Sequence, residues 1–179
     1  MRALSLKLMP YEVSQGEFCC GNNSIETSIC SSYYATLLKQ AYAYQICEGN
    51  IIIGYCMVYL KRISLDIMKS VENDEYNSGI VDGYTSAHIS YIAIAADKQH
   101  RGYGTLTLKG IIKNILELSK RLPIRLITLD ALPEYEDWYC GIGFREIPCA
   151  NNFSDIIPMY MDCMSNEEKN KRAEYSQEY

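Results

Sequence analysis

Residues 94–106 read IAADKQHRGYGTL, and this stretch decides the fold class because it joins a buried strand to an amphipathic helix. The compact apolar run His88–Ala96 predicts the strand. Apolar residues then recur at steps of three and four, which predicts a helix over about Tyr103–Lys120 that Pro123 ends. A glycine-rich turn before a helix is a physical site for anions, since backbone N–H groups and the helix dipole both favour negative charge there.

The turn departs from two common nucleotide-binding patterns. The sequence contains no G-x-x-x-x-G-K-[ST] P-loop. A dinucleotide-binding turn needs G-x-G-x-x-G directly after its strand, and Thr107 stands where the third glycine belongs. Asp130, after the next predicted strand, could bind a ribose as in that fold, so this alternative stays open. A plain turn that needs glycine only for a positive φ is a further alternative.

Outward from this unit, the pattern predicts one α/β domain. Arg2–Met9 alternates as a strand, and residues 22–40 are helical, as one helix or two short ones. The β-rich runs over 43–48 and 51–60 flank a two-residue turn and predict a hairpin. Residues 64–87 are expected to form a helix or loop and an acidic connection. The elements expected after this unit are strands over 124–130, 144–148 and 157–163, a short helix over 134–141, and a polar tail or helix over 165–179.

Composition places the chain among globular proteins and limits its partners. It has 179 residues, with 48% apolar and 22% charged side chains, which fits about one domain. A net charge of −5 argues against a large phosphate-neutralising surface.

The eight cysteines include no C-x-x-C pair and only two histidines accompany them, so we expect reduced thiols and no metal site. We find no apolar run of about 20 residues and no signal peptide, and expect a cytoplasmic protein without membrane contact.

The glycine turn resembles the pyrophosphate-binding motif of the GNAT family of N-acetyltransferases, R/Q-x-x-G-x-G/A. In register, the motif falls on Arg101-x-x-Gly104-x-Leu106. Leu106 departs from the small residue that the family has at this position. A second register, Gln99-x-x-Gly102-x-Gly104, also satisfies the letters of the motif.

Other segments extend the resemblance over about residues 2–164. Residues 138–144, WYCGIGF, resemble the family's F-Y-x-x-x-G-F segment. Residues 18–22, 53–55 and 124–131 resemble a branch of the family that includes tRNA-acetylating toxins paired with ribbon-helix-helix antitoxins. In that branch, an F-x-C-G segment precedes the first helix and a G-Y pair lies in the third strand.

The resemblance implies a GNAT fold. This is an α/β (α+β) fold with a mixed central sheet of about six to seven strands, splayed central strands and flanking helices, here as a single domain over residues 1–164. It also implies acetyl-CoA as the donor co-substrate, a primary amine of a small molecule or peptide as the acceptor, and no metal. The residues expected to bind the donor are Ile94, Ala95, Ala96, Arg101, Gly102, Tyr103, Gly104, Thr105 and Leu106. Further candidates beside the donor are Lys98, His100 and Lys109.

Tyr139 matches the position of the family's general acid, which protonates the leaving thiolate. A phenol suits that role because its usual pKa of about 10 keeps it protonated at neutral pH. The base that takes the proton of the amine is less defined. His88 is a candidate, since its usual pKa of about 6.5 suits the task. The other candidates for the base are Ser90, Glu134 and Glu136. We expect Cys140 to pack within the short helix and Trp138 to be an aromatic anchor under it.

Two other functions stay open beside the acetylation of a small amine. A toxin-like enzyme that acetylates aminoacyl-tRNA, with an antitoxin as partner, needs a basic surface. A non-catalytic binding module is suggested by the departure at Leu106. A homodimer is expected by analogy alone. The basic residues that cluster near the motif helix are Lys109, Lys113, Lys120, Arg121 and Arg125, and the acidic residues that would attract a cationic amine are Glu72, Asp74, Glu75 and Asp82.

Overall fold

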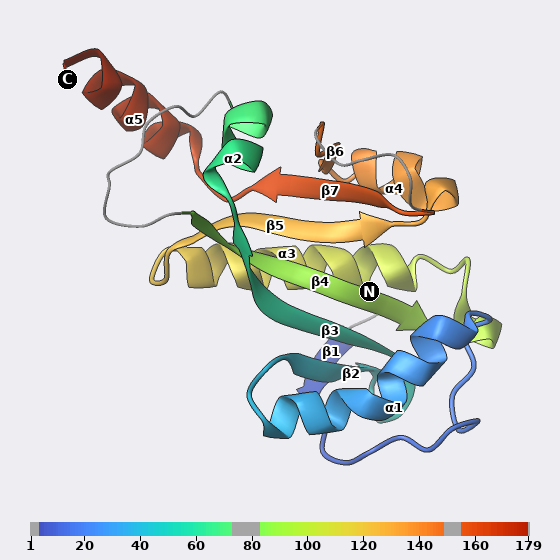
Figure 1. The fold of residues 1–179 in the computed structure, drawn as a ribbon. Helices are drawn as coiled ribbons and strands as arrows, with labels where there is room; N and C mark the ends of the chain where they lie inside the picture. Colours follow the sequence, from blue (N-terminus) through green and yellow to red (C-terminus); the bar gives the residue numbers. More distant parts are fainter. Residues whose placement is uncertain (1–3, 73–82, 149–154, 179) are drawn as a thin grey trace. The chain divides into compact units, whose positions relative to one another are not determined.

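The computed structural model describes residues 4–72, 83–148 and 155–178. They form a mixed seven-stranded sheet in the order β1-β2-β3-β4-β5-β7-β6, with flanking helices (Figure 1). The strands are β1 (Leu4–Leu8), β2 (Tyr42–Glu48), β3 (Ile51–Ile63), β4 (Tyr84–Ile94), β5 (Ile124–Ala131), β6 (Arg145–Glu146) and β7 (Ile157–Asp162). The helices are α1 (Asn23–Leu37), α2 (Leu65–Glu72), α3 (Tyr103–Ser119), α4 (Glu136–Cys140) and α5 (Asn166–Glu178), with short 3-10 helices at Ala96–Lys98 and Pro133–Tyr135. The predicted fold class is confirmed.

The chain contains two compact units. The first holds residues 1–60 and 88–114, and the second holds residues 61–87 and 115–179. The single domain over residues 1–164 and the splay of the central strands stay predictions.

Some predicted boundaries were wrong. β4 begins at Tyr84 and not at His88. The hydroxyl of Ser86 is buried, donates to the carbonyl of Lys61 at 3.1 Å and lies 3.2 Å from Oγ1 of Thr128. These polar partners allow residues that read as a loop to lie in a sheet. The other differences are that the strand over 144–148 shrinks to two residues and that the helix over 134–141 begins as a 3-10 turn, whereas residues 22–40 hold one helix, one of the two expected alternatives.

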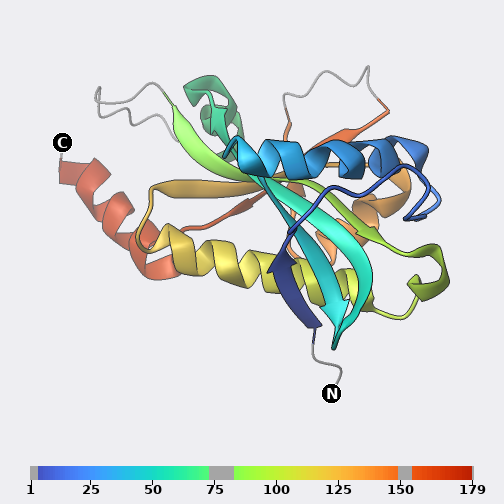
Figure 2. The ribbon, with the colours of Figure 1, turned by 90° about the horizontal axis from the view of Figure 1, so that it is seen from below.

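The core of the first unit lies between α1 and the strands. α1 begins after Asn22, whose side-chain oxygen accepts a hydrogen bond from the N–H of Ile25 at 3.1 Å and caps the helix. At its other end, Oγ1 of Thr36 accepts from the N–H of Ala43 at 3.0 Å and ties α1 to β2. Figure 2 shows the ribbon of α1, in blue, beside the strands of this unit. The buried apolar residues of this core are Met9, Val13, Ile29, Ala43, Tyr55, Tyr91 and Ala93.

β3 approaches the end of β4 unusually closely at Gly54. A Cβ atom at this position would collide with the carbonyl oxygen of Ala93. The register of β2 and β3 shifts at the same place, because Ile46 pairs with Gly54 whereas Cys47 pairs with Ile52. The extra residue on β3 forms a bulge, and a bulge bends its strand locally. Glycine at position 54 is therefore a packing requirement.

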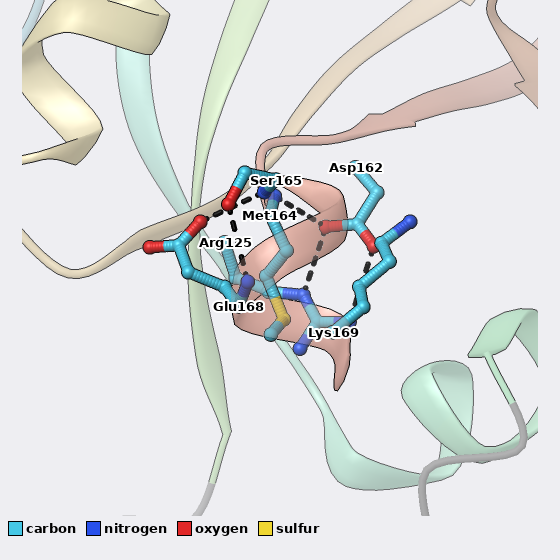
Figure 3. Close-up of polar contacts among 6 residues, drawn as sticks. All are labelled: Arg125, Asp162, Met164, Ser165, Glu168 and Lys169. Carbon is cyan, nitrogen blue, oxygen red and sulfur yellow. Dashed lines mark hydrogen bonds and ion pairs between the residues drawn. The ribbon is translucent and has the colours of Figure 1, made fainter. Parts of the chain in front are cut away.

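In the second unit, β7 pairs antiparallel with both β5 and β6, over a core that includes Met68, Leu126 and Tyr160. The side chain of Asp162, at the end of β7, is only 6% exposed. Its carboxylate accepts from Nε of Arg125 at 3.1 Å, from the N–H of Met164 at 2.9 Å and from Nζ of Lys169 at 2.9 Å (Figure 3).

These contacts hold the start of α5. Ser165 and Glu168 form a reciprocal capping box, with the N–H of Ser165 donating to Oε2 of Glu168 at 2.7 Å and the N–H of Glu168 donating to Oγ of Ser165 at 3.2 Å. The sequence of α5 is polar along nearly its whole length, so a hydrophobic face contributes little to its attachment. The buried carboxylate of Asp162 ties α5 to the end of β7 through Lys169, and the capping box stabilises the first turn of the helix.

Replacing Gly54 with alanine should destabilise the protein strongly, because the added methyl group meets backbone that cannot move without breaking the sheet. We expect a loss of about 2–4 kcal/mol in the free energy of unfolding, measured by urea denaturation. Gly110→Ala is the matched control, since a Cβ there meets no atom within 4 Å. Alanine should stabilise this helical position by up to about 1 kcal/mol. Equal effects of the two substitutions would contradict the close approach.

Replacing Asp162 with asparagine should cost about 3 kcal/mol at neutral pH, because it leaves the guanidinium of Arg125 buried without its partner. Burial raises the pKa of Asp162, but the N–H of Met164 and the charges of Lys169 and Arg125 outweigh burial and hold it below its usual value. A carboxyl group with a lowered pKa stabilises the fold above its unfolded value of about 3.9 and loses this effect as the pH falls.

The difference in unfolding free energy between wild type and Asp162→Asn should therefore shrink as the pH falls below about 4. Urea denaturation at pH 7 and at pH 3.5 measures it. The exposed pair of Glu167 and Lys171 supplies the control, and Glu167→Gln should change stability by less than about 0.5 kcal/mol. A constant difference across this pH range would refute the role assigned to the charge of Asp162.

Candidate functional site

Backbone hydrogen bonds fix the first two residues after β4. The N–H of Ala95 donates to the carbonyl of Ile53 at 2.9 Å, and the N–H of Ala96 donates to the carbonyl of Cys19 at 3.0 Å. Both N–H groups are thus engaged within the protein. The binding of the donor by Ile94, Ala95 and Ala96 stays a prediction. The N–H groups of Ala95 and Ala96 already donate within the protein and are not available to the donor.

The turn before α3 uses left-handed backbone at His100, with φ of 58°, and at Gly102, with φ of 83°. The first helical hydrogen bond runs from the N–H of Leu106 to the carbonyl of Gly102 at 3.1 Å. In an α-helix the N–H groups of the first turn point out of the N-terminal end. Here they belong to residues 103–105. The predicted anion site therefore has the geometry of a helix N-terminus behind a glycine turn.

The side chains around this turn differ in what they can offer a ligand. Tyr103 is 3% exposed, and its hydroxyl donates to Oε2 of Glu48 at 2.7 Å, so only its backbone faces the turn. Its side chain instead anchors α3. A Cβ at Gly102 would meet no atom within 4 Å, so the surface of the turn is open there. Leu106 is 48% exposed and does not fill the core.

The predicted cations near the turn have different surroundings. Nζ of Lys98 lies 2.8 Å from the carboxylate of Asp97, and this pairing holds the pKa of Asp97 below its usual value. The side chains of His100, Arg101 and Lys109 are exposed. Arg101 directly precedes Gly102, so its exposed guanidinium lies next in the chain to the turn before the helix end.

Two upstream segments that the sequence singled out lie against this turn. The rings of Phe18 and Tyr55 meet edge to face, with 5.0 Å between their centres. The N–H groups of Cys20 and Gly21 donate to Oε1 of Glu26 at 2.8 and 3.0 Å. The carbonyls of residues 19 and 20 then accept hydrogen bonds from the turn. The segments with the F-x-C-G and G-Y patterns therefore hold the backbone of the turn that forms the predicted anion site.

Tyr139 lies in α4, where it is half-buried beside two aromatic rings. Its ring centre is 4.6 Å from that of Trp138 and 5.8 Å from that of Phe144. Its carbonyl accepts from the N–H of Phe144 at 3.1 Å, which closes the turn after the helix. Burial, with a smaller effect of Tyr135, raises the pKa of Tyr139 to about 12. The phenol therefore stays protonated at any physiological pH, as a proton donor requires.

The candidates for a base are less favourable than the sequence indicated. His88 was expected at the start of its strand, but it lies within β4, is 4% exposed and has its ring centre 4.9 Å from that of Tyr59. Ser90 and Glu134 are exposed, and Glu136 is half-buried. The role of each stays a prediction. Cys140 is exposed, so the expectation that it packs the short helix was wrong.

The predicted basic cluster is smaller than the sequence suggested. Arg125 is buried against Asp162, and Lys120 pairs with Glu117 at 2.7 Å. Lys109 and Lys113, one turn apart on α3, and Arg121 are exposed. Of the acidic residues, Glu72 ends α2, and the other three lie outside the described residues.

Within residues 4–72, 83–148 and 155–178, no three His, Cys, Asp or Glu side chains gather to hold a metal ion. The seven cysteines in this part of the chain are free thiols. None of the described helices combines the length and the apolar character needed to cross a membrane.

Solved structures share this fold. One described as a bacterial toxin has a TM-score of 0.75 and 18% identity, over 91% of this chain and 92% of that one. The toxin AtaT complexed with acetyl-methionyl-tRNAfMet has a TM-score of 0.72 and 15% identity, over 89% and 95%. A tyrosine-to-phenylalanine mutant of KacT has a TM-score of 0.71 and 14% identity, over 91% and 96%.

The chain has the fold of the GNAT toxins. The predicted GNAT fold is therefore confirmed, and the similarity extends to the toxin branch that the upstream segments resemble. No protein-family model and no curated protein sequence matches the chain. At the identities found, the comparisons concern the fold alone.

Proposed function

We propose that this chain is an N-acetyltransferase that transfers the acetyl group of acetyl-CoA to a primary amine. The observation that carries the proposal is the N-terminus of α3, which opens behind the left-handed turn at Gly102 directly after β4. This arrangement suits a diphosphate, because it combines the N–H groups and the positive dipole end of a helix N-terminus with an open surface at Gly102. The solved AtaTR complex bound with AcCoA, with a TM-score of 0.68 and 14% identity, supports this choice of donor.

The donor site would be built mainly from backbone. The N–H groups of residues 103–105 would hold the diphosphate, and the exposed guanidinium of Arg101 would add a charge-assisted contact. Tyr103 fixes the helix by its contact with Glu48 and does not itself need to touch the donor. Acetyl-CoA supplies the activated acyl group, and the protein supplies position and a proton.

Tyr139 would act as the general acid. As the nitrogen of the amine forms its bond to the acyl carbon, the carbon–sulfur bond breaks and the leaving thiolate takes the proton of the Tyr139 hydroxyl. The amine must first lose a proton, which passes to water or to a side chain such as His88 or Glu136. Among the described residues no hydrogen bond of the Tyr139 hydroxyl is seen, so its proton is available to a ligand.

Two acceptors fit the same chemistry. The amine of a small molecule or peptide needs no special surface, whereas the α-amine of aminoacyl-tRNA needs a basic one. The AtaT complex with acetyl-methionyl-tRNAfMet favours the second, and exposed Lys109 and Lys113 are the cations of α3 that would serve it. A mutant of AtaT is also solved bound to the C-terminus of the antitoxin AtaR. If this chain acetylates aminoacyl-tRNA, we therefore expect an antitoxin as its protein partner.

Acetylation assays with labelled acetyl-CoA would separate these acceptors. Charged tRNA, deacylated tRNA, polyamines and short peptides are the substrates to compare. If charged tRNA is the acceptor, Lys109→Glu combined with Lys113→Glu should raise its KM and weaken its salt-dependent binding. Lys113→Glu alone, at a residue outside the donor-binding candidates, should leave the KM for acetyl-CoA unchanged.

The donor site is tested by calorimetric titration with acetyl-CoA. Wild type should bind with a micromolar Kd, and Gly104→Arg should abolish binding because its side chain fills the first turn of α3. Gly110→Arg is the matched control, since it adds the same side chain to the same helix about 9 Å further along. Failure of the wild type to bind acetyl-CoA would reject the proposed function and favour the non-catalytic module.

Tyr139→Phe should lower kcat by about 100-fold or more, the usual contribution of a general acid, with little change in the KM for acetyl-CoA. Tyr135→Phe, at the exposed tyrosine four residues before Tyr139, should leave kcat within about twofold.

Because the pKa of Tyr139 is raised to about 12, wild type should keep its activity from pH 7 to pH 10. A loss of activity with an apparent pKa near 10 that disappears in Tyr139→Phe would contradict this assignment.

A further inference from the structure

Gln99 occupies a position in the turn that the proposed chemistry leaves unexplained. It follows the short 3-10 helix after β4 and precedes the left-handed residue His100. Its side chain is half-buried, and its Nε2 donates to the carbonyl of Cys20 at 2.8 Å and to the carbonyl of Ile94 at 2.9 Å. Both neighbours are hydrogen-bond acceptors, so the amide must present its NH₂ group and not its oxygen to them.

The two acceptors belong to parts of the chain that are far apart in sequence. Ile94 is the last residue of β4, whereas Cys20 lies 79 residues before Gln99 in the segment that leads into α1. One amide group therefore joins the end of the strand, the turn and this segment. The backbone bond from Ala96 to Cys19 runs beside it and makes a second link between the same two stretches.

The segment that receives Gln99 is itself fixed by α1. Oε1 of Glu26 accepts from the N–H groups of Cys20 and Gly21, and these contacts lower the pKa of Glu26. The peptide units around Cys20 thus donate to Glu26 on one side and accept from Gln99 on the other. The path from Glu26 to Gln99 is a continuous series of hydrogen bonds that ends at the turn before α3.

We propose that Gln99 is a positioning residue whose amide ties the turn over residues 95–102 to residues 19–21 and holds the N-terminus of α3 in the conformation that binds the donor. This inference rests on the proposed function for the identity of the ligand. A turn with two left-handed residues populates alternatives unless its neighbours fix it, and affinity falls in proportion to the population of the competent conformation. Without the amide, the turn should spend only part of its time in that conformation.

Gln99→Met removes both donors at nearly constant length and charge. Calorimetry should show a Kd for acetyl-CoA raised about tenfold, and kinetics should show a similar rise in the KM for acetyl-CoA with kcat and the acceptor KM nearly unchanged. Thr36→Val is the control, because it breaks a buried hydrogen bond between α1 and β2 in the same unit. It should lower thermal stability and leave the Kd for acetyl-CoA unaltered.

Glu26→Ala tests the path. If Glu26 and Gln99 act through the same segment, the double variant with Gln99→Met should bind acetyl-CoA no more weakly than the weaker single variant. Independent effects would instead multiply. Multiplying effects would overturn the link from α1 to the turn.

Hydrogen exchange on the ligand-free protein separates this inference from the proposed function. Gln99→Met should speed amide exchange in residues 95–106 and leave exchange in β5 unchanged. Unaltered exchange in residues 95–106 of Gln99→Met would overturn the positioning role. If wild type binds acetyl-CoA, an equal Kd in Gln99→Met would overturn it as well. If wild type fails to bind acetyl-CoA, the proposed function falls, and the exchange of residues 95–106 still decides whether Gln99 orders the turn.

Discussion

The close passage of β3 beside the end of β4 sets the geometry of the first unit. Gly54 allows the two backbones to approach where any side chain would strike the carbonyl of Ala93. The bulge at the same point places the carbonyl of Ile53 where it accepts the N–H of Ala95. β3 thus holds the chain one residue beyond the end of β4. Everything that follows, from the 3-10 helix to the N-terminus of α3, is positioned from that point.

The two units are stabilised by different kinds of contact around their functional parts. In the first unit, a turn with unusual backbone is held by hydrogen bonds to a distant segment and by the anchor of Tyr103 on Glu48. In the second, Tyr139 packs against aromatic rings, and the ion pair of Lys169 with the buried carboxylate of Asp162 attaches the polar helix α5. The proposed anion site depends on backbone dihedral angles, which hydrogen bonds fix in the first unit, whereas the proposed acid depends on the partial burial of a phenol, which ring packing provides in the second.

Much of this structure follows from sequence pattern because it depends on local periodicity. The strand and helix around residues 94–106 were predictable from the change of period, and the turn from its glycines. The position of Tyr139 came from resemblance to a family motif, and its surroundings came only from the structure. The start of β4 was missed because Tyr84, Thr85 and Ser86 read as polar loop, and their partners in the sheet are invisible to a local pattern.

Contacts between distant residues account for the remaining errors. Arg125 read as part of a basic surface, but its partner Asp162 lies 37 residues away. Gln99 read as one letter of an alternative motif register, and nothing near it in sequence indicates that its amide binds Cys20. His88 read as a titratable residue at a strand end, and its depth follows from where β4 begins.

Burial, and not a charged partner, is the main cause of the high pKa of Tyr139. Attraction between charges weakens as ionic strength rises, but the cost of removing a phenolate from water does not. The protonation of this phenol should therefore be nearly indifferent to salt and sensitive to hydration. Because Tyr139 is only partly buried, a motion that exposes its ring further would bring its pKa back toward that of an ordinary phenol.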